Sequence, residues 1–319
     1  MSDTKRPHVM TVLGPVDAGA LGVVDAHSHL CIAPVAGGPS DAPVLSDEAG
    51  VGRELVSWRA AGGGAVVDCQ PGGCGRDGRV LRRLSERTAV HVVAATGFHR
   101  RRYYPPDAPL FGLSATAAAD RIRDEIAGGL AETRADGDGP VVYPGVIKIA
   151  AEASLEVSPR ALFEAAAAVA KETGYAIEMH TERGAAVEEF LAFFGGQGLS
   201  PRRLVFCHVD KRPDFGLHRE LARAGVMLEY DTFFRPKYEP ERNVWPLIGR
   251  MAAAGLAGQV ALATDMAEPA LWAELGGWPG MQGIFTIIKA GLERMGLPAA
   301  TIDGLLGGNI AGRLAVGNH

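Results

Sequence analysis

The sequence predicts an α/β fold, a (β/α)8 TIM barrel, from two patterns that run along its 319 residues. Short runs rich in Val, Ile or Leu recur at intervals, which is typical of the buried strands of a parallel sheet. Segments with helical periodicity lie between most of these runs, and about 250 residues suffice for eight such units. The eight runs span residues 22–29, 65–69, 91–97, 145–150, 175–180, 203–209, 226–231 and 259–265.

The clearest helix is predicted over residues 158–174. Ser158 is a suitable N-cap, Pro159 fits the first helical position and Gly174 supplies a C-terminal stop. An open doubly wound sheet is the alternative fold, but it more often carries a Gly-rich phosphate motif after its first strand. No GxGxxG or GxxxxGK[ST] follows the first run, at residues 22–29. Further helices are expected over residues 116–130, 215–225 and 241–255, with a closing helix around 301–316.

Composition limits the domain count and the partners. No linker or internal repeat divides the chain, so we expect one domain over residues 1–319, with a lead-in over residues 1–21. The net charge of −5 argues against nucleic acid or an anionic membrane as partner. No stretch approaches the roughly 18 apolar residues of a membrane span, and the polar start lacks a secretory signal. Four cysteines make no disulfide framework in so long a chain, so we expect a cytoplasmic protein.

Ligand-type side chains gather where the predicted strands end. In such a barrel the chemistry collects at the carboxyl ends of the strands, and five of the eight runs supply the candidate histidine, aspartate and lysine ligands. Alternate residues of a strand share a face, so His27 and His29 can grip one ion together. Zinc accepts imidazole and carboxylate ligands. The candidate metal ligands are His27, His29, Lys148, His180, His208 and Asp265.

Lys148 is unusual because it lies among the apolar residues of the predicted strand 145–150. A buried charge is costly, so its amine should be neutral or paired. Desolvation would lower its pKa and leave a nucleophilic amine. Such an amine can add carbon dioxide and become a carbamate, an anionic ligand able to bridge two metal ions. The alternative is an ion pair with Glu178, which has the same parity as His180 in its strand.

These residues, in this order, resemble the amidohydrolase superfamily and, within it, the phosphotriesterase family. Residues 11–30 resemble the opening segment of that family, and residues 66–105 resemble its second and third units. The closing GGNIAGRL at 307–314 resembles its last helix. The resemblance implies a hydrolase that acts on ester bonds and uses two divalent ions, expected to be Zn²⁺.

The resemblance also implies a role for each ligand. His27, His29 and Asp265 would bind the more buried ion. His180 and His208 would bind the more exposed ion. Carboxylated Lys148 and a hydroxide would bridge the two ions. Asp265 would be the catalytic residue that takes the hydroxide's proton and passes it toward the leaving group.

The loops after the third and seventh strands should decide the substrate. Arg235, Lys237 and Tyr238 resemble the phosphate-binding loop of the phosphorylated sugar-lactone hydrolases of this family. Arginine presents a fork suited to phosphate oxygens, and lysine adds a point charge. After the third strand, His99 and Arg100 are further candidates for substrate contact. We therefore expect a small, anionic substrate, most simply a phosphorylated sugar lactone that the enzyme opens.

Other readings stay open. A phosphotriesterase for neutral substrates would prefer an uncharged aromatic pocket, and an N-acyl homoserine lactonase would need an apolar channel. Phe233, Phe234 and Trp245 could build such a channel. Phe233 and Phe234 also depart from the pattern of the phosphorylated sugar-lactone hydrolases, in which smaller or more polar residues are expected just before the position of Arg235. A non-catalytic, metal-free binding protein of the same fold is a third possibility. His91 and His218 are expected to be structural. The family often forms homodimers, so a dimer is possible.

Overall fold

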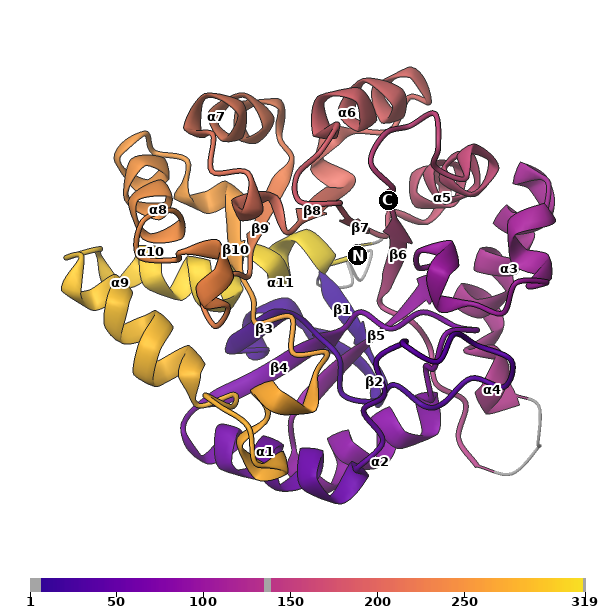
Figure 1. Cartoon of the computed structure of the whole chain (residues 1–319), viewed down its shortest axis with the longest axis horizontal. Coiled ribbons are helices and arrows are strands. Elements are labelled where there is room, and N and C mark those ends of the chain that lie inside the picture. The colour runs from indigo at the N-terminus through magenta and orange to yellow at the C-terminus, as the bar shows by residue number, and fades with distance from the viewer. Residues whose placement is uncertain (1–6, 135–138, 318–319) are drawn as a thin grey trace, which may run out of the picture.

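In the computed structural model, which describes residues 7–134 and 139–317, eight parallel strands form the centre of the molecule (Figure 1). They follow one another around the sheet in chain order from β3 to β10. Beyond β10, the backbone N–H of Asp265 donates to the carbonyl of His27 at 2.8 Å and links the last strand to the first. The predicted barrel is confirmed. Its strands are β3 (Val23–Ser28), β4 (Gly63–Asp68), β5 (His91–Gly97), β6 (Val146–Ala150), β7 (Ile177–His180), β8 (Leu204–Cys207), β9 (Met227–Tyr230) and β10 (Val260–Leu262).

Helices surround the strands on the outside of the barrel (Figure 1). The four helices predicted between strands are present as α3, α5, α7 and α8, with ends shifted by up to three residues. None of the helices in the described residues is both long and apolar enough to cross a bilayer. The outer helices are α1 (Glu48–Ala60), α2 (Gly78–Thr88), α3 (Ala115–Gly128), α4 (Ala131–Arg134), α5 (Arg160–Thr173), α6 (Val187–Gly196), α7 (Phe215–Ala224), α8 (Val244–Ala253) and α9 (Ala290–Arg294).

The start of α5 differs from its prediction, although its end does not. Gly174 ends the helix in the left-handed conformation, with φ of 74°, as the sequence indicated. Ser158 does not cap the helix, which begins at Arg160. Its hydroxyl instead donates to the carbonyl of Ser154 and accepts from the backbone N–H of Glu152. Ser158 therefore stabilises the loop after β6.

Small side chains fill the amino-terminal part of the barrel interior. Ala26, Ala65 and Ala95 are fully buried there together with Val67 and Val93. Larger apolar side chains lie between the sheet and the helices, where Trp58 and Phe163 are among the biggest buried residues. Because successive residues of a strand point to opposite faces, each strand contributes to both layers.

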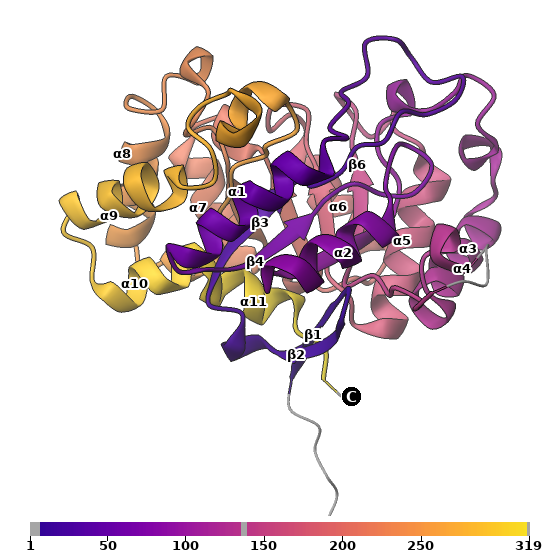
Figure 2. The same cartoon turned by 90° about the horizontal axis from the view of Figure 1, so that it is seen from below.

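A hairpin closes the end of the barrel opposite to the loop between β3 and α1 (Figure 2). Its strands, β1 (His8–Thr11) and β2 (Gly14–Asp17), pair antiparallel, and His8 forms a bridge with Val316 near the carboxyl end of the chain. The hairpin belongs to the predicted lead-in. It leaves the other end of the barrel, where the strands finish, open to solvent.

The closing helix predicted around 301–316 is wrong as one continuous element. The chain forms α10 (Ala299–Asp303), a π-helical stretch over Gly304–Gly308, and α11 (Asn309–Leu314). The interruption lies at Gly307, whose backbone departs from helical geometry. A Cβ on this residue would lie 2.3 Å from the carbonyl oxygen of Gly22, so only glycine lets the segment approach β3 this closely.

This contact predicts a stability difference between two glycines. Gly307→Ala should destabilise the fold by about 1–3 kcal/mol, because the added methyl must push two backbones apart. Gly312→Ala is the matched control, since a Cβ there meets nothing within 4 Å and alanine favours the helix by up to about 1 kcal/mol. Urea unfolding of both variants measures the difference. Equal stability of the two variants would contradict the packing argument.

Candidate metal centre

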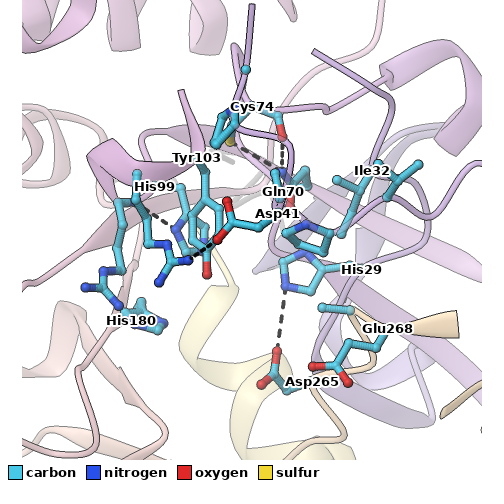
Figure 3. A pocket seen from close by; sticks show the side chains of 18 of the residues that line it. His29, Ile32, Asp41, Gln70, Cys74, His99, Tyr103, His180, Asp265 and Glu268 are labelled. Carbon is cyan, nitrogen blue, oxygen red and sulfur yellow. Dashed lines mark hydrogen bonds and ion pairs between the residues drawn. The ribbon is translucent and has the colours of Figure 1, made fainter. Parts of the chain in front are cut away.

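An open cavity of about 750 Å³ lies at the carboxyl ends of the strands (Figure 3). Its walls come from loops that follow the strands, chiefly within residues 32–44, 99–103 and 235–238. Five of the six predicted ligands line it, and the sixth, Lys148, is fully buried beneath. The lining ligands are His27, His29, His180, His208 and Asp265.

His27, His29 and Asp265 form one group of possible metal ligands. Both histidines come from the end of β3, and Asp265 follows β10. One carboxylate oxygen of Asp265 lies 3.8 Å from Nε2 of His27 and 3.7 Å from Nε2 of His29. Figure 3 shows the carboxylate of Asp265 facing the ring of His29. The i, i+2 spacing predicted from the sequence therefore does place both rings on one side.

His180 and His208 form a second group beside the first. Their ring centroids lie 4.7 Å apart, and the ring of His208 lies 5.0 Å from that of His27. The second carboxylate oxygen of Asp265 is 3.8 Å from Nδ1 of His208. Within the described residues, Nε2 of His180 is buried without a hydrogen-bond partner. Asp265 thus lies between the two groups.

Two of these residues lie just past the observed strands, although the predicted strands 203–209 and 259–265 included them. β8 ends at Cys207 and β10 at Leu262. His208 and Asp265 then adopt left-handed backbone conformations, with φ of 62° and 49°. For residues other than glycine this costs of order 1–3 kcal/mol and often marks a functional site. The cost is consistent with a backbone shaped to aim these side chains.

All four histidines are held neutral. Burial lowers the pKa of His29 to about 4 and that of His180 below its ordinary value. Burial, together with the charge of Lys148 for His27 and of Lys211 for His208, lowers the pKa of these two further. Neutral rings keep a nitrogen lone pair available at neutral pH, which a metal ligand requires.

Asp265 stays charged although it is largely buried. Burial alone would raise its pKa, but the charge of Arg235 holds it below the ordinary value. Nη2 of Arg235 lies 3.3 Å from a carboxylate oxygen of Asp265. A carboxylate between neutral imidazoles is a donor set that suits a divalent ion.

Lys148 is fully buried, and its Nζ lies 3.4 Å from Nε2 of His27. It also lies 3.6 Å from a carboxylate oxygen of Glu178, so the alternative pairing is present in the unmodified side chain. Although burial would lower its pKa, the thiols of Cys207 and Cys69 and the carboxylate of Glu178 hold it well above the ordinary value. Burial itself acts in the direction predicted from the sequence, but these neighbours, which the sequence did not show, outweigh it in the unmodified side chain.

The predicted substrate-binding residues also line the cavity, but some of them are already paired with other protein groups. Arg235 is committed to Asp265, since it also donates to the carbonyls of Thr264 and Asp265. Arg100 is ion-paired with Glu152 and Glu182. The charges of both arginines are therefore already matched by protein groups. His99 is buried, and its ring lies 5.4 Å from that of His180.

Lys237 and Tyr238 also line the cavity. The ammonium of Lys237 lies 5.2 Å from the centre of the Tyr238 ring. Lys211 was not predicted from the sequence. Its ammonium lies 5.3 Å from the centre of the same Tyr238 ring and 3.9 Å from a carboxylate oxygen of Asp231. Its position three residues after His208 was the available signal. Gln70, Tyr103 and Glu268 were missed as lining residues too.

The aromatic residues considered for an acyl channel do not line the cavity. Phe233 and Phe234 are buried in the core, and Trp245 packs on Phe233 with ring centroids 5.1 Å apart. His218 is structural, as predicted, because its ring contacts the hydroxyl of Tyr230 at 2.8 Å and the carbonyl of Arg212 at 3.0 Å.

Two buried carboxylates on β9 and just after it were also missed. Glu229 lies 2.7 Å from Nδ1 of His27, and Asp231 lies 2.5 Å from Nδ1 of His208. Their i, i+2 spacing in the run 226–231 puts both on one face. The sequence could therefore have indicated an inward-facing acidic pair.

The chain is similar to several known hydrolases. The chain is 28% identical over 253 residues to a phospho-furanose lactonase of Mycoplasmopsis agalactiae, covering 74% of this chain and 70% of the relative. It is 30% identical over 258 residues to an N-acetyltaurine hydrolase of Tetraodon nigroviridis, covering 70% and 71%. Its fold matches the crystal structure of a lactonase from Listeria monocytogenes with a TM-score of 0.87 and 19% identity, over 98% of this chain and all of the other.

A model of one protein family matches almost the whole described chain, from residue 7 to residue 311. The match confirms the resemblance seen in the sequence and the expected class of enzyme. The chain belongs to the phosphotriesterase family and is a hydrolase that acts on ester or lactone bonds.

Proposed function

We propose that the protein is a binuclear metal-dependent lactonase that opens a phosphorylated sugar lactone. The observation that carries the proposal is one cavity in which four neutral histidines and Asp265 face a wall with Lys211 and Lys237. Relatives named phospho-furanose lactonase support the same substrate class.

The donor atoms fit two divalent ions. His27, His29 and Asp265 would hold one ion, and His180 and His208 the other. Lys148, as its carbamate, would lie between them. Nε2 of His180 supports this fit, because it is buried without a hydrogen bond among the described residues and the carboxylate of Glu182 lies 3.9 Å away, beyond hydrogen-bond length. When bound, ions such as Zn²⁺ would lower the pKa of a water molecule and polarise the substrate carbonyl.

The protein's own groups would then move the proton. Asp265 is a carboxylate at neutral pH and touches both ligand groups, so it can accept a proton from the attacking water. Addition of water to the lactone carbonyl breaks the ring C–O bond, and Asp265 can return the proton to the departing ring oxygen. Arg235 fixes the carboxylate during this transfer. The product is a hydroxy acid.

Lys237 is the best candidate to receive the anionic group of the substrate. Among the described residues, no carboxylate lies within ion-pair distance of it, in contrast to Arg235 and Arg100. Lys211 and the hydroxyl of Tyr238 stand beside it in the same wall. An ammonium is a strong point donor to phosphate oxygens.

The other candidate functions find less support in the cavity. A phosphotriesterase for neutral substrates would not need this charged wall. An acyl channel lacks Phe233, Phe234 and Trp245 as lining residues. An amide hydrolase acting on N-acetyltaurine would use the same wall, because taurine carries a sulfonate, and one relative has that name.

A screen with phosphorylated lactones, neutral lactones, N-acetyltaurine and a phosphotriester separates these functions. Activity on none of these compounds would favour a non-catalytic binding protein.

Lys148→Ala tests the metal centre. We expect the variant to bind each ion at least about 100-fold more weakly and to lose hydrolysis, because the bridging ligand is removed. Metal analysis after dialysis and the initial rate on a phosphorylated lactone measure both effects. Lys171→Ala is the control, since Lys171 lies on the outer helix α5 and donates to the carbonyl of Gln197, away from the cavity. Full metal content and turnover in Lys148→Ala would rule out the binuclear centre.

Lys237→Ala tests the substrate class. We expect KM for a phosphorylated lactone to rise about tenfold, since one charged contact of roughly 1.5 kcal/mol is lost. KM for the neutral lactone should not change, and Lys237→Arg should retain most of the affinity. Arg235 is unsuitable for this test because it also holds Asp265. An equal loss on both lactones would remove the phosphate assignment and leave the metal centre untouched.

A further inference from the structure

One buried contact beneath the cavity is not used by the proposed mechanism. Glu229, on β9, is fully buried, and its Oε1 lies 2.7 Å from Nδ1 of His27. The other ring nitrogen of His27, Nε2, points toward Asp265 at 3.8 Å and toward Lys148 at 3.4 Å. One ring edge therefore faces the candidate ligands, and the opposite edge faces a carboxyl group that is no candidate ligand in the proposed centre.

The structure assigns to Glu229 the role of a positioning residue, which holds the ring of His27 so that Nε2 faces the ion. This inference rests on the metal-dependent function proposed above. With an ion on Nε2, Nδ1 carries the ring hydrogen and donates it to the carboxyl oxygen of Glu229. Such contacts fix the ring orientation and make the ligand nitrogen more basic.

The surroundings of Glu229 argue against a purely structural role. Within the described residues, its Oε2 has no hydrogen-bond partner, so the side chain buries a polar atom at a cost. A buried carboxyl of this kind adds little to stability compared with an apolar side chain of similar volume. Its retention at this position is better explained by what it does to His27.

The neighbouring Glu178 is a weaker candidate for the same role. Its Oε1 lies 3.4 Å from Nδ1 of His27, beyond the usual length of a hydrogen bond to nitrogen. The same oxygen already accepts from the thiol of Cys69 at 2.6 Å and lies 3.6 Å from Lys148. Glu178 is therefore engaged elsewhere, and we do not expect it to replace Glu229.

The test measures metal affinity apart from activity. The metal-free full-length protein and its variants are titrated with Zn²⁺ in competition with a chromophoric chelator, and thermal unfolding of the metal-free forms is recorded. Glu229→Met removes the acceptor but keeps the volume. We expect the tighter of the two binding steps to weaken about 10- to 100-fold, with an unfolding temperature equal to or above that of the unchanged protein. Glu229→Gln, whose amide oxygen can accept the same hydrogen, should recover part of the affinity.

A matched control is Asp68→Asn. Asp68 is another fully buried carboxyl in the barrel, on β4, but it accepts from backbone N–H groups, including those of Leu30 and Gln70, and not from a candidate ligand ring among the described residues. We expect it to lose stability and to keep its Zn²⁺ affinity. Unchanged affinity in Glu229→Met, or a loss that merely follows lost stability, would overturn the positioning role. Failure of the unchanged protein to bind Zn²⁺ would instead overturn the proposed function, and with it this inference.

Discussion

The hydrogen bond between the backbone N–H of Asp265 and the carbonyl of His27 is the contact on which the site depends. It links the segment after β10 to β3, and both of the residues that it joins are candidate metal ligands. Residues that are more than 230 positions apart in the chain thereby share one rim. Parallel strands in a closed barrel all finish at this rim, so each needs only one or two ligand side chains near its end. The left-handed backbone of Asp265 and His208 completes the convergence.

Beneath the cavity, the barrel interior contains several fully buried ionisable side chains. Lys148, Glu178 and Glu229 are all fully buried, and each contacts His27 or one of its neighbours. An apolar interior would be cheaper for stability, since unpaired buried charge is among the most costly features of a fold. The histidines above are neutral, so the acids do not serve to balance them. The arrangement makes sense when positive ions occupy the rim, because two divalent cations would reverse the charge balance of the layer below.

The features that could be predicted from the sequence are those that depend on neighbouring residues in the chain. The features that could not be predicted depend on contacts between distant segments. Strand alternation and the position of strand ends are local properties, so the barrel and the pairing of His27 with His29 could be predicted. The break at Gly307 could not, because it results from the approach of β3, which is distant in the chain. The raised pKa of Lys148 and the pairing of Arg100 with Glu152 and Glu182 also depend on residues from other strands and loops. The role of Glu229 was hidden in the same way, although its spacing from Asp231 was visible.

Arg235 shows why residue type alone does not assign a role in such a site. The same arginine would suit a phosphate, yet here its guanidinium holds Asp265 and two backbone carbonyls. In the proposed mechanism Asp265 takes up and returns a proton, and Arg235 fixes the orientation of its carboxylate and keeps it ionised by lowering its pKa. In the proposed function, Lys237 would therefore bind the anionic group of the substrate, because no carboxylate among the described residues lies within ion-pair distance of it. The net charge of −5 does not oppose this, because the field that a small substrate meets is set by the few charges lining the cavity.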